Sequence, residues 1–302
     1  MTILDIVIVA LGCLVTGQPK DVCMRIGDTE QQESRVAGAQ PATNPRLPVR
    51  TGQAIDVDLT AQSVLAWDEE TGMILYEKNA SEVRPIASLS KLLSALVVRS
   101  VLSPTALVEV PPQVRQAQRR GANVKLPVGE HVSVADLLAA GLTASANDAL
   151  VTLAMATYGS EEAFVSRANT FAQQHGFLNT RVSNATGLMG GEQYSTAYDV
   201  KEIFRAVYRD SLLGSYLNSP RGVLRTQEGT TLGYQSTNKL IGTYLPILAG
   251  KTGYTSEAGQ NLALMTEGEQ GQRIGIIVLG SKARFQDAKV LVEWVRRNYR
   301  WE

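Results

Sequence analysis

Histidine and cysteine are scarce in this sequence. Its 302 residues contain two histidines, His131 and His175, and two cysteines, Cys13 and Cys23. Both cysteines fall in the first tenth of the chain, so four Cys or His ligands cannot be gathered around a structural zinc ion. A serine or cysteine triad needs a histidine base, and only these two histidines are available for it. We therefore expect no metal site and no cofactor, and any nucleophile must be activated by another group.

The sequence also lacks an excess of charge of either sign. Lys and Arg together number 29, as do Asp and Glu. A protein that binds nucleic acid normally carries a basic excess, because phosphate groups attract it. We therefore expect no nucleic-acid partner. Hydrophobic residues make up 44% of the chain, which is enough to bury one or two cores.

A long hydrophobic run is missing as well. Residues 6–15 form an apolar run that suits the core of a signal peptide but is shorter than the roughly 20 residues of a membrane span. Asp5 precedes the run, and the basic residues typical of a signal peptide are absent before it. We interpret residues 1–26 as an apolar segment, either an export signal or anchor, with Cys13 as a lipidation candidate, or a packed terminal element. A membrane contact is expected only through this segment.

The rest of the chain predicts a linker followed by one domain. Residues 27–53 are rich in Gly, Pro and polar residues, which is typical of a disordered linker. Residues 54–302 have strand patterns at both ends and a mostly helical insertion over about 100–230. The predicted strands are Ser63 to Trp67, Met73 to Tyr76, Gly259 to Thr266 and Arg273 to Gly280, and the predicted helices are residues 85–98, 133–142, 160–175 and 284–299. This pattern predicts an α+β fold with an antiparallel sheet of about five strands, drawn from both ends of the domain and flanked by helices.

The first candidate for chemistry is Ser88-x-x-Lys91. Residues three apart share one face of a helix, so the hydroxyl and the ammonium can touch. Lys91 is the only charge between Arg84 and Arg99, in a segment whose pattern predicts burial. Burial lowers the pKa of a lysine, which can then activate a serine without histidine. The alternatives are a serine cap with a lysine that reaches the surface, or Ser90 as the nucleophile.

Two further motifs carry polar groups of the same kind. In Ser145-Ala146-Asn147, a hydroxyl and a carboxamide can face one cleft if the backbone there is not helical. In Lys251-Thr252-Gly253, the glycine allows a substrate backbone to approach and the lysine attracts a carboxylate. Taken singly, Ser145-Ala146-Asn147 is also consistent with an ordinary helix end. Lys251-Thr252-Gly253 is also consistent with a turn beside a strand.

Together the three motifs resemble a known series. Ser-x-x-Lys, Ser-x-Asn and Lys-Thr-Gly occur in this order in penicillin-binding proteins and class A β-lactamases. The chain resembles a D-alanyl-D-alanine carboxypeptidase of the low-molecular-mass penicillin-binding proteins over residues 58–300, which implies a β-lactamase/transpeptidase-like fold. Other matching segments are Thr71-Gly72-x-x-Leu75-Tyr76, Gly129-Glu130, Ser145–Ala149, Asn184-x-x-Gly187-Leu188, Ser195-Thr196-Ala197, Ala258-Gly259 and Arg284.

The resemblance implies a role for each catalytic residue. Ser88 would attack the carbonyl of the penultimate D-Ala, Lys91 would accept its proton, and Ser145 would pass a proton toward the leaving amine. The backbone N–H groups of Ser88 and Tyr254 would form the oxyanion hole.

The resemblance also implies the residues that bind the substrate. Asn147 would hold the substrate amide. Lys251, Thr252, Gly253 and Arg284 would bind or orient the terminal carboxylate. The implied partners are peptidoglycan stem peptides and β-lactam antibiotics. Because peptidoglycan lies outside the cytoplasmic membrane, the resemblance implies an exported protein, in the periplasm or on the outer face of that membrane.

Two departures from the family pattern bear on the bond that is cleaved. Thr237, in Ser236-Thr237-Asn238, stands where the family often has an arginine. The 302 residues also end directly after the final predicted helix, without the β-rich domain and membrane anchor of many members. Both features favour an endopeptidase over a strict carboxypeptidase.

Two other functions remain as alternatives. A class A-like β-lactamase would need a glutamate on a loop between the second and third motifs, and the sequence around Glu192 does not resemble that loop. A non-catalytic peptidoglycan-binding protein could share the same fold, since fold does not fix function.

Overall fold

The computed structural model describes residues 46–53 and 56–302. The predicted N-terminal segment, residues 1–26, lies outside the described residues, and so does most of the predicted linker. Among the helices of the described part, none has the length and hydrophobicity needed to cross a membrane.

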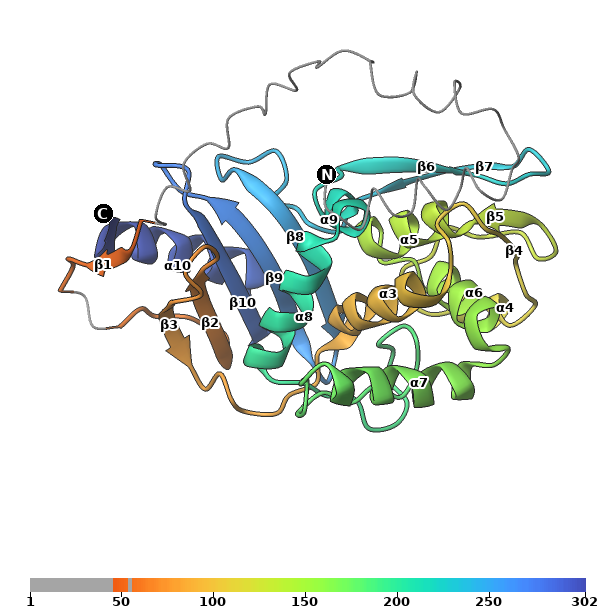
Figure 1. The fold of residues 1–302 in the computed structure, drawn as a ribbon, viewed down its shortest axis with the longest axis horizontal. Coiled ribbons are helices and arrows are strands. Elements are labelled where there is room, and N and C mark those ends of the chain that lie inside the picture. Colours follow the sequence, from red (N-terminus) through yellow and green to blue (C-terminus); the bar gives the residue numbers. More distant parts are fainter. Residues whose placement is uncertain (1–45, 54–55) are drawn as a thin grey trace, which may run out of the picture. The chain divides into compact units, whose positions relative to one another are not determined.

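A five-stranded antiparallel sheet forms the centre of the described domain (Figure 1). The strand order is β3-β2-β10-β9-β8, so β8 is an edge strand. The strands are β2 (Ser63–Asp68), β3 (Ile74–Lys78), β8 (Ile247–Thr255), β9 (Gly259–Glu267) and β10 (Arg273–Ser281). The N-terminal pair joins the C-terminal strands where β2 pairs with β10. The predicted α+β class, with a sheet drawn from both ends of the domain, is confirmed.

Each face of the sheet is covered by helices. Helix α10 (Arg284–Asn298) lies on one face, where Val64 and Ile276 belong to the same hydrophobic cluster as residues of α10. Helices α3 (Ser90–Val101) and α8 (Ala197–Arg209) lie on the other, with Leu65 and Ile277 in their cluster. Neighbouring residues of one strand therefore supply two different cores, as the alternation of side chains along a strand requires.

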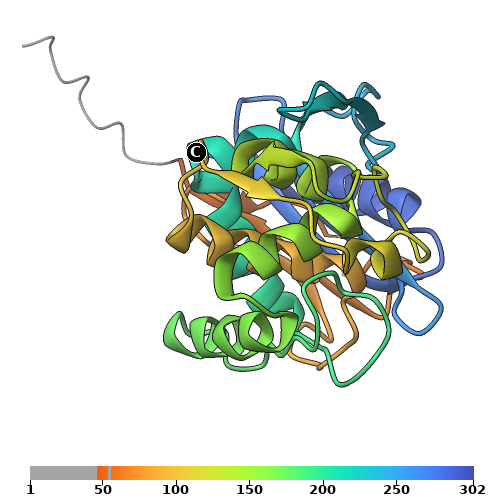
Figure 2. The same ribbon diagram turned by 90° about the vertical axis from the view of Figure 1, so that its right-hand side faces the viewer.

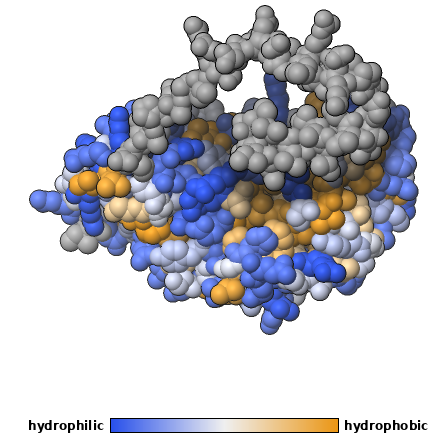
Figure 3. All heavy atoms as spheres, in the orientation of Figure 1, coloured by the Kyte–Doolittle hydropathy of each residue, from blue (hydrophilic) through white to orange (hydrophobic). Residues whose placement is uncertain are grey.

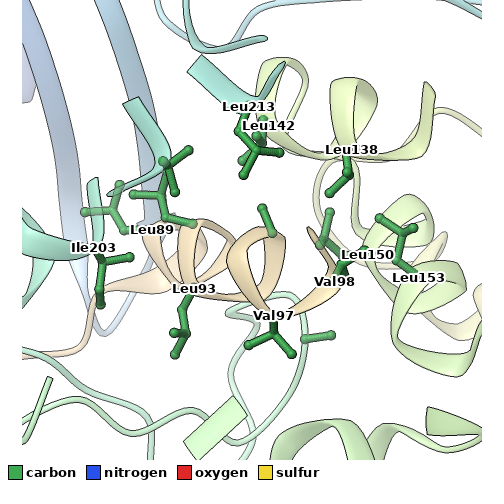
Figure 4. Packing of buried hydrophobic residues seen from close by; sticks show 14 of the residues in the cluster. Leu89, Leu93, Val97, Val98, Leu138, Leu142, Leu150, Leu153, Ile203 and Leu213 are labelled. Atoms are coloured by element: carbon green, nitrogen blue, oxygen red, sulfur yellow. The ribbon is translucent and has the colours of Figure 1, made fainter. Parts of the chain in front are cut away.

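Helix α3 is buried within the larger core. Its residues Leu93 and Val97 and the preceding Leu89 belong to one hydrophobic cluster with residues of the surrounding helices, and Figure 4 shows them leaving the helix on different sides. The same cluster includes Leu138, Leu142, Leu150, Leu153, Ile203 and Leu213. A helix that is apolar on every side is expected to be surrounded in this way. The predicted helix at 85–98 begins later than expected, because Ala87–Leu89 form a 3₁₀ turn, η2, before α3 starts at Ser90.

The remaining helices gather at one end of the sheet and face the viewer in Figure 2. They are α4 (Val114–Ala117), α5 (Val134–Thr143), α6 (Asn147–Tyr158), α7 (Glu161–Gln174) and α9 (Ser211–Leu217). Helices α5 and α7 begin as the sequence predicts, since the Ser133 and Ser160 side chains accept hydrogen bonds from backbone amides of the first turn. Figure 3 shows that hydrophobic residues gather near the middle of the face drawn there, with hydrophilic residues around them.

Two small two-stranded sheets accompany these helices. Strand β4 (Leu107–Glu109) pairs with β5 (His131–Ser133), and β6 (Arg221–Arg225) pairs with β7 (Thr231–Gln235). The sequence analysis had placed a mostly helical insertion here and predicted no strands in it. Strands of three to five residues span too few positions to show a period of two.

The predicted linker at 27–53 is wrong at its end. Residues Pro48–Arg50 form strand β1, which pairs with β11 (Tyr299–Trp301) at the far end of the chain. The amide of Leu47 also donates to the carbonyl of Glu302. These partners are supplied by distant residues, so the local composition of the segment does not indicate them.

Candidate active site

The hydroxyl of Ser88 and the amine of Lys91 lie together at the start of α3. Ser88 belongs to the turn η2, and Lys91 to the first turn of the helix. The Nζ atom of Lys91 lies 2.8 Å from Oγ of Ser88, and it donates a hydrogen bond to the carbonyl of Thr186. Lys91 is completely buried. The sequence predicted this pair from its spacing, and the structure brings the two groups into contact.

Burial determines the protonation of Lys91. Loss of hydration and the nearby charge of Lys251 lower the pKa of the Lys91 amine well below its ordinary value. Within the described residues, neither lysine has a carboxylate at ion-pair distance that would oppose this shift. The environment therefore favours the neutral amine, which has a lone pair that can accept a proton.

Ser88 is a better placed nucleophile than Ser90. The Ser90 side chain is buried, and its Oγ has no hydrogen-bond partner within the described chain. The Lys91 amine is in contact with Ser88 and not with Ser90. The structure therefore offers Ser88, but not Ser90, a base at hydrogen-bond distance.

Two residues in the site have an unusual backbone. Ala87, directly before the nucleophile, has φ of +48°, and Ser145 has φ of +60°. Non-glycine residues rarely adopt this left-handed conformation, and such strain is concentrated at functional sites. Gly187 packs against the first of them, since a Cβ on Gly187 would lie 2.2 Å from the carbonyl oxygen of Ala87. The turn that presents Ser88 is thus fixed by close packing.

Ser145 and Lys251 connect the helical part to the sheet edge. Ser145 lies between α5 and α6, and Lys251 lies on β8. The Nζ atom of Lys251 donates to Oγ of Ser145 at 2.8 Å and to the carbonyl of Thr252 at 3.0 Å. Burial, together with the charge of Arg284, lowers the pKa of Lys251 to about 7. Near neutral pH this amine can therefore exchange protons with the Ser145 hydroxyl.

The side-chain oxygen of Asn147 is free to accept a hydrogen bond. Asn147 is the first residue of α6. Its Nδ2 donates to the carbonyl of Arg120 at 2.9 Å, and its backbone amide donates to the carbonyl of Ala122 at 2.8 Å. Its Oδ1 is buried without a hydrogen-bond partner in the described part of the chain. A buried acceptor without a partner is costly, so this oxygen is suited to accept an N–H from a ligand.

Strand β8 passes directly beside the nucleophile. A Cβ on Gly253 would lie 2.7 Å from the carbonyl oxygen of Ile86 and 3.2 Å from the amide nitrogen of Ser88, so only glycine fits without a shift. Tyr254 follows on the same strand, and its side chain is 64% exposed. The two backbone amides that the resemblance implies for the oxyanion hole, those of Ser88 and Tyr254, therefore belong to segments that lie against each other.

Arg284 and two threonines complete the side of the site formed by β8. The Nη1 atom of Arg284 donates to the carbonyl of Gly253 at 2.8 Å, which anchors the start of α10 to the strand. The Thr252 and Thr237 hydroxyl oxygens lie 2.5 Å apart. Thr237 thus places a neutral hydroxyl beside Thr252.

The sequence analysis missed two contributors that act through their backbone. Thr186 supplies the carbonyl that contacts Lys91, and Arg120 supplies the one that contacts Asn147. The sequence around Asn184 and Gly187 indicated a turn, but no local signal showed where that turn would pack.

Glu192 forms no hydrogen bond to the catalytic groups within the described chain. Its side chain is exposed, and its nearest cationic partner is Arg181 at 3.9 Å. Among the described residues, no glutamate is hydrogen-bonded to Ser88. In the described residues there is no cluster of three or more His, Cys, Asp or Glu side chains that could hold a metal ion.

Comparison with known proteins gives relatives along most of the chain. The sequence profile of the D-alanyl-D-alanine carboxypeptidase family matches residues 49–283. A D-alanyl-D-alanine endopeptidase of Pseudomonas aeruginosa is 34% identical over 261 residues, which are 84% of this chain and 83% of that protein. The D-alanyl-D-alanine carboxypeptidase DacF of Bacillus subtilis is 29% identical over 234 residues, which are 76% of this chain and 60% of that protein.

Solved structures share the fold. A D-alanyl-D-alanine carboxypeptidase from Mycobacterium tuberculosis matches with a TM-score of 0.74 and 26% identity, over 81% of this chain and 94% of that chain. Penicillin-binding protein D2 from Listeria monocytogenes, in its ampicillin-bound form, matches with a TM-score of 0.65 and 30% identity, over 79% of this chain and 98% of that chain. With the family profile covering most of the domain described above, the chain belongs to the D-alanyl-D-alanine carboxypeptidase family and is a serine DD-peptidase.

Proposed function

We propose that the protein hydrolyses D-alanyl bonds of peptidoglycan stem peptides through an acyl-enzyme on Ser88. The observation that carries this proposal is the fully buried Lys91 amine, 2.8 Å from Oγ of Ser88 and without an acidic partner in the described chain. A serine next to a neutral amine can be deprotonated as it attacks, which removes the need for a histidine base.

Acylation proceeds in one proton transfer and one attack. Oγ of Ser88 attacks the carbonyl carbon of the penultimate D-Ala while its proton moves to Nζ of Lys91. The negative charge that develops on the carbonyl oxygen is held by the N–H groups of Ser88 and Tyr254. Losing one such donor typically lowers the rate by about 10²–10³.

Breakdown of the intermediate needs a proton on the leaving amine. Ser145 is the donor, because its hydroxyl is in contact with Lys251 and can be reprotonated from that amine. The C–N bond breaks as the proton arrives, and the acyl group stays on Ser88 as an ester. Lys91 then returns the proton it took from Ser88 to the Ser145–Lys251 pair and becomes neutral again. Water attacks the ester while Lys91 accepts its proton and passes it to Oγ of Ser88 as the ester bond breaks, which regenerates the free serine.

The site is suited to an anionic group. Lys91, Lys251 and Arg284 bring three basic side chains together, and none of them has a carboxylate at ion-pair distance among the described residues. A substrate carboxylate bound by Lys251, Thr252 and Arg284 supplies the missing negative charge. Gly253 lets the substrate backbone approach β8, and Oδ1 of Asn147 accepts an amide N–H of the substrate.

We favour cleavage of cross-links over removal of a terminal D-Ala. Thr237 supplies no positive charge beside Thr252, so a free terminal carboxylate loses one charge-assisted contact. The Pseudomonas aeruginosa relative, which is 34% identical, is called an endopeptidase and is covered over 83% of its length. A cross-linked substrate depends less on that one contact, because its binding is spread over a longer chain.

β-Lactams should acylate Ser88, as expected for a site that accepts D-Ala-D-Ala. The Listeria monocytogenes relative contains ampicillin in its solved structure. Because peptidoglycan is outside the cytoplasmic membrane, we propose that the protein works there.

The test is the intact mass of the protein after a short exposure to benzylpenicillin. We expect the mass of one full β-lactam to be added, with the adduct on the tryptic peptide that carries Ser88. Ser88→Ala should abolish the adduct, while the matched control Ser90→Ala should keep it. An adduct that persists in Ser88→Ala contradicts the assignment. Rapid turnover of penicillin would indicate a β-lactamase, and absence of any adduct a non-catalytic binding protein.

A further inference from the structure

The turn from Asn184 to Leu188 places a backbone carbonyl against the amine of Lys91. The carbonyl of Thr186 accepts a hydrogen bond from Nζ of Lys91, and Oγ of Ser88 lies 3.4 Å from the same oxygen. Thr186 is buried and stands 95 positions from Lys91 in the chain. Its peptide group must therefore be held in this place by contacts of its own.

The side chain of Asn184 holds that peptide group from the opposite end. Oδ1 of Asn184 accepts from the amide of Gly187 at 2.8 Å, and this amide belongs to the same peptide bond as the carbonyl of Thr186. A trans peptide is planar, so its N–H and its C=O point in opposite directions. While Asn184 holds the N–H, the C=O is directed away from Asn184 and toward Lys91.

The same side chain forms the rest of the turn. Oδ1 of Asn184 also accepts from the amide of Thr186 at 3.1 Å and from its hydroxyl at 3.0 Å, and Nδ2 donates to the carbonyl of Leu188 at 2.8 Å. Gly187 has φ of +76°, a conformation that favours glycine. An asparagine side chain that bonds to the backbone of its own turn takes over the part of a backbone carbonyl. In the described chain, the amides of Thr186 and Gly187 have this one acceptor.

Contacts from two helices hold the neighbouring residue, Ala185. Ser94 of α3 donates to its carbonyl at 2.9 Å, and a carboxylate oxygen of Glu161 in α7 accepts from its amide at 3.0 Å. These bonds fix the place of the loop on the helices. They do not reach the next peptide group, which carries the carbonyl that faces the catalytic amine. Asn184 is therefore the side chain that sets the direction of that carbonyl.

The carbonyl determines how the amine meets the nucleophile. A neutral lysine amine has two N–H groups and one lone pair. When one N–H is directed to the carbonyl of Thr186, the lone pair can face Oγ of Ser88, which is 2.8 Å from Nζ of Lys91. Without this acceptor, the amine can turn about its C–N bond and donate to Oγ instead. It then has no lone pair in position to accept the serine proton, although it is still within reach.

We propose that Asn184 is a positioning residue for acylation, which fixes the carbonyl of Thr186 and through it orients the amine of Lys91 toward Ser88. In the described chain, Asn184 forms no hydrogen bond with Ser88 or Lys91 itself. The inference rests on the proposed function, because it takes Lys91 as the base for Ser88.

The test is the kinetics of acylation by benzylpenicillin at a series of concentrations. This series separates the dissociation constant of the initial complex from the rate constant of acylation. Asn184→Leu removes both hydrogen-bonding groups with little change in size. It should lower the rate constant about 10²-fold, the loss that a misplacement of about 1 Å can cause, and leave the dissociation constant nearly unchanged. The protein should still be acylated completely at the end of the reaction, which a partly unfolded sample would not be.

Asn184→Asp is the conservative variant. It keeps an acceptor for the amides of Thr186 and Gly187 and loses the donor to Leu188. It should be acylated about tenfold faster than Asn184→Leu or more, because hydrogen bonds to a charged acceptor typically contribute at least this factor. Should Asn184→Leu fail to fold, Asn184→Ala takes its place with the same expectation.

Asn169→Leu is the matched control. Asn169 is also half-buried, and its Nδ2 and Oδ1 bind the carbonyl and the amide of Val182 at 2.9 Å each, before the turn begins. Its loss should lower the free energy of unfolding and leave the rate constant of acylation unchanged.

Three results would overturn the role of Asn184. They are a wild-type rate constant in Asn184→Leu, an equal loss of rate in Asn169→Leu, and no recovery in Asn184→Asp. In each case a wild type acylated on Ser88 would still support the proposed function. A wild type that benzylpenicillin does not acylate would contradict the proposed function, and this inference with it.

Discussion

At the scale of single residues, the proposed chemistry depends on two lysines that are buried with no acid partner among the described residues. The pKa of each is lowered by loss of hydration, and each also senses a second cation, Lys251 in the case of Lys91 and Arg284 in the case of Lys251. The two lysines titrate as a coupled pair beside the charge of Arg284, so a measured pKa belongs to the pair and not to one residue.

This coupling predicts the pH dependence of acylation. The rate of acylation by benzylpenicillin should rise with pH on the acid side, because Lys91 must be neutral to accept the Ser88 proton. The apparent pKa of this rise should lie well below the roughly 10.4 of a free lysine. The measurement is the second-order acylation rate between about pH 5 and 10, the range that brackets these pKa values. A rate that does not change with pH, with acylation limiting, would exclude Lys91 as the base.

The glycine beside the nucleophile gives a second prediction. Gly253→Ala should reduce acylation by about 10²–10³, the cost typical of a lost oxyanion donor, because the new Cβ pushes β8 away from Ile86 and Ser88. Gly233→Ala on β7 is the control, since its Cβ would meet no atom within 4 Å. Acylation rates and thermal unfolding of both variants should be compared. An active Gly253→Ala protein would show that the close approach of β8 is not needed.

The third prediction concerns the end of the substrate that carries the terminal carboxylate, and it rests on Thr237. We expect a higher kcat/KM for cross-linked muropeptide dimers than for a free pentapeptide. Thr237→Arg should raise the rate on the pentapeptide about tenfold or more, because a charge-assisted contact to a carboxylate contributes roughly 1.5–3 kcal/mol. The measurement is the rate of product formation from the dimers and from the pentapeptide, for the wild type and for Thr237→Arg. Faster release of D-Ala from pentapeptide by the wild type would show that Lys251 and Arg284 suffice for the carboxylate.

The residues that could be predicted from the sequence were those with a local pattern. Ser88 and Lys91 are three positions apart, and a helical spacing is enough to bring them together. Thr186 contacts Lys91 from 95 positions away and through its carbonyl, which every residue possesses. No property of its side chain could have indicated that role.

At the scale of elements, the loop between α4 and β5 is held by one buried carboxylate. Asp148, in the first turn of α6, accepts hydrogen bonds from the amides of Val124 and Leu126 and from the Gln118 side chain. It is next to Asn147 in the chain, which binds the same loop. We therefore expect Asp148 to be a positioning residue, which acts through the loop that Asn147 also binds.

Asp148→Asn should loosen this loop. Each carboxylate oxygen of Asp148 accepts from two donors, so the new NH₂ group, which cannot accept, leaves two donors without that partner, and a buried amide among them costs about 1–3 kcal/mol in the free energy of unfolding. Acylation should slow, and hydrogen exchange should increase at residues 122–126. Asp58→Asn, at an exposed position, is the control. Unchanged exchange in this loop would contradict the role assigned to Asp148.

Length alone did not decide which elements could be predicted, because α6, α8 and β8 span 12, 13 and 9 residues and none of them was assigned from the sequence. Helices α5, α7 and α10 and strands β9 and β10 follow the predicted ranges closely, because each repeats its hydrophobic period several times. Strands β1 and β11 have three residues each and are defined by pairing with each other across the whole domain. Their pairing depends on the completed fold and has no local pattern.

At the scale of the molecule, the active site lies where the helical part meets the edge of the sheet. Ser88 and Ser145 come from the helical part, and Lys251 and Gly253 come from the edge strand β8. The contact between Lys251 and Ser145 connects the two. This arrangement buries Lys251 at the junction with no acid partner among the described residues. We expect its burial to lower the free energy of unfolding of the protein.

The last prediction follows from linkage between folding and protonation. The folded-state pKa of Lys251, about 7, lies below the roughly 10.4 of an unfolded lysine, so the unfolded state binds more protons between these values. The free energy of unfolding should therefore rise with pH across this window. Lys251→Met should remove this penalty and stabilise the protein most at or below pH 7, by about 5 kcal/mol at the upper limit, with the gain vanishing toward pH 10. Denaturant unfolding of both proteins at several pH values measures this. Two results would contradict this expectation: equal free energies of unfolding for the wild type and Lys251→Met at pH 6, or a difference between them that does not shrink as the pH rises. Either result would show that burial of Lys251 does not destabilise the folded protein.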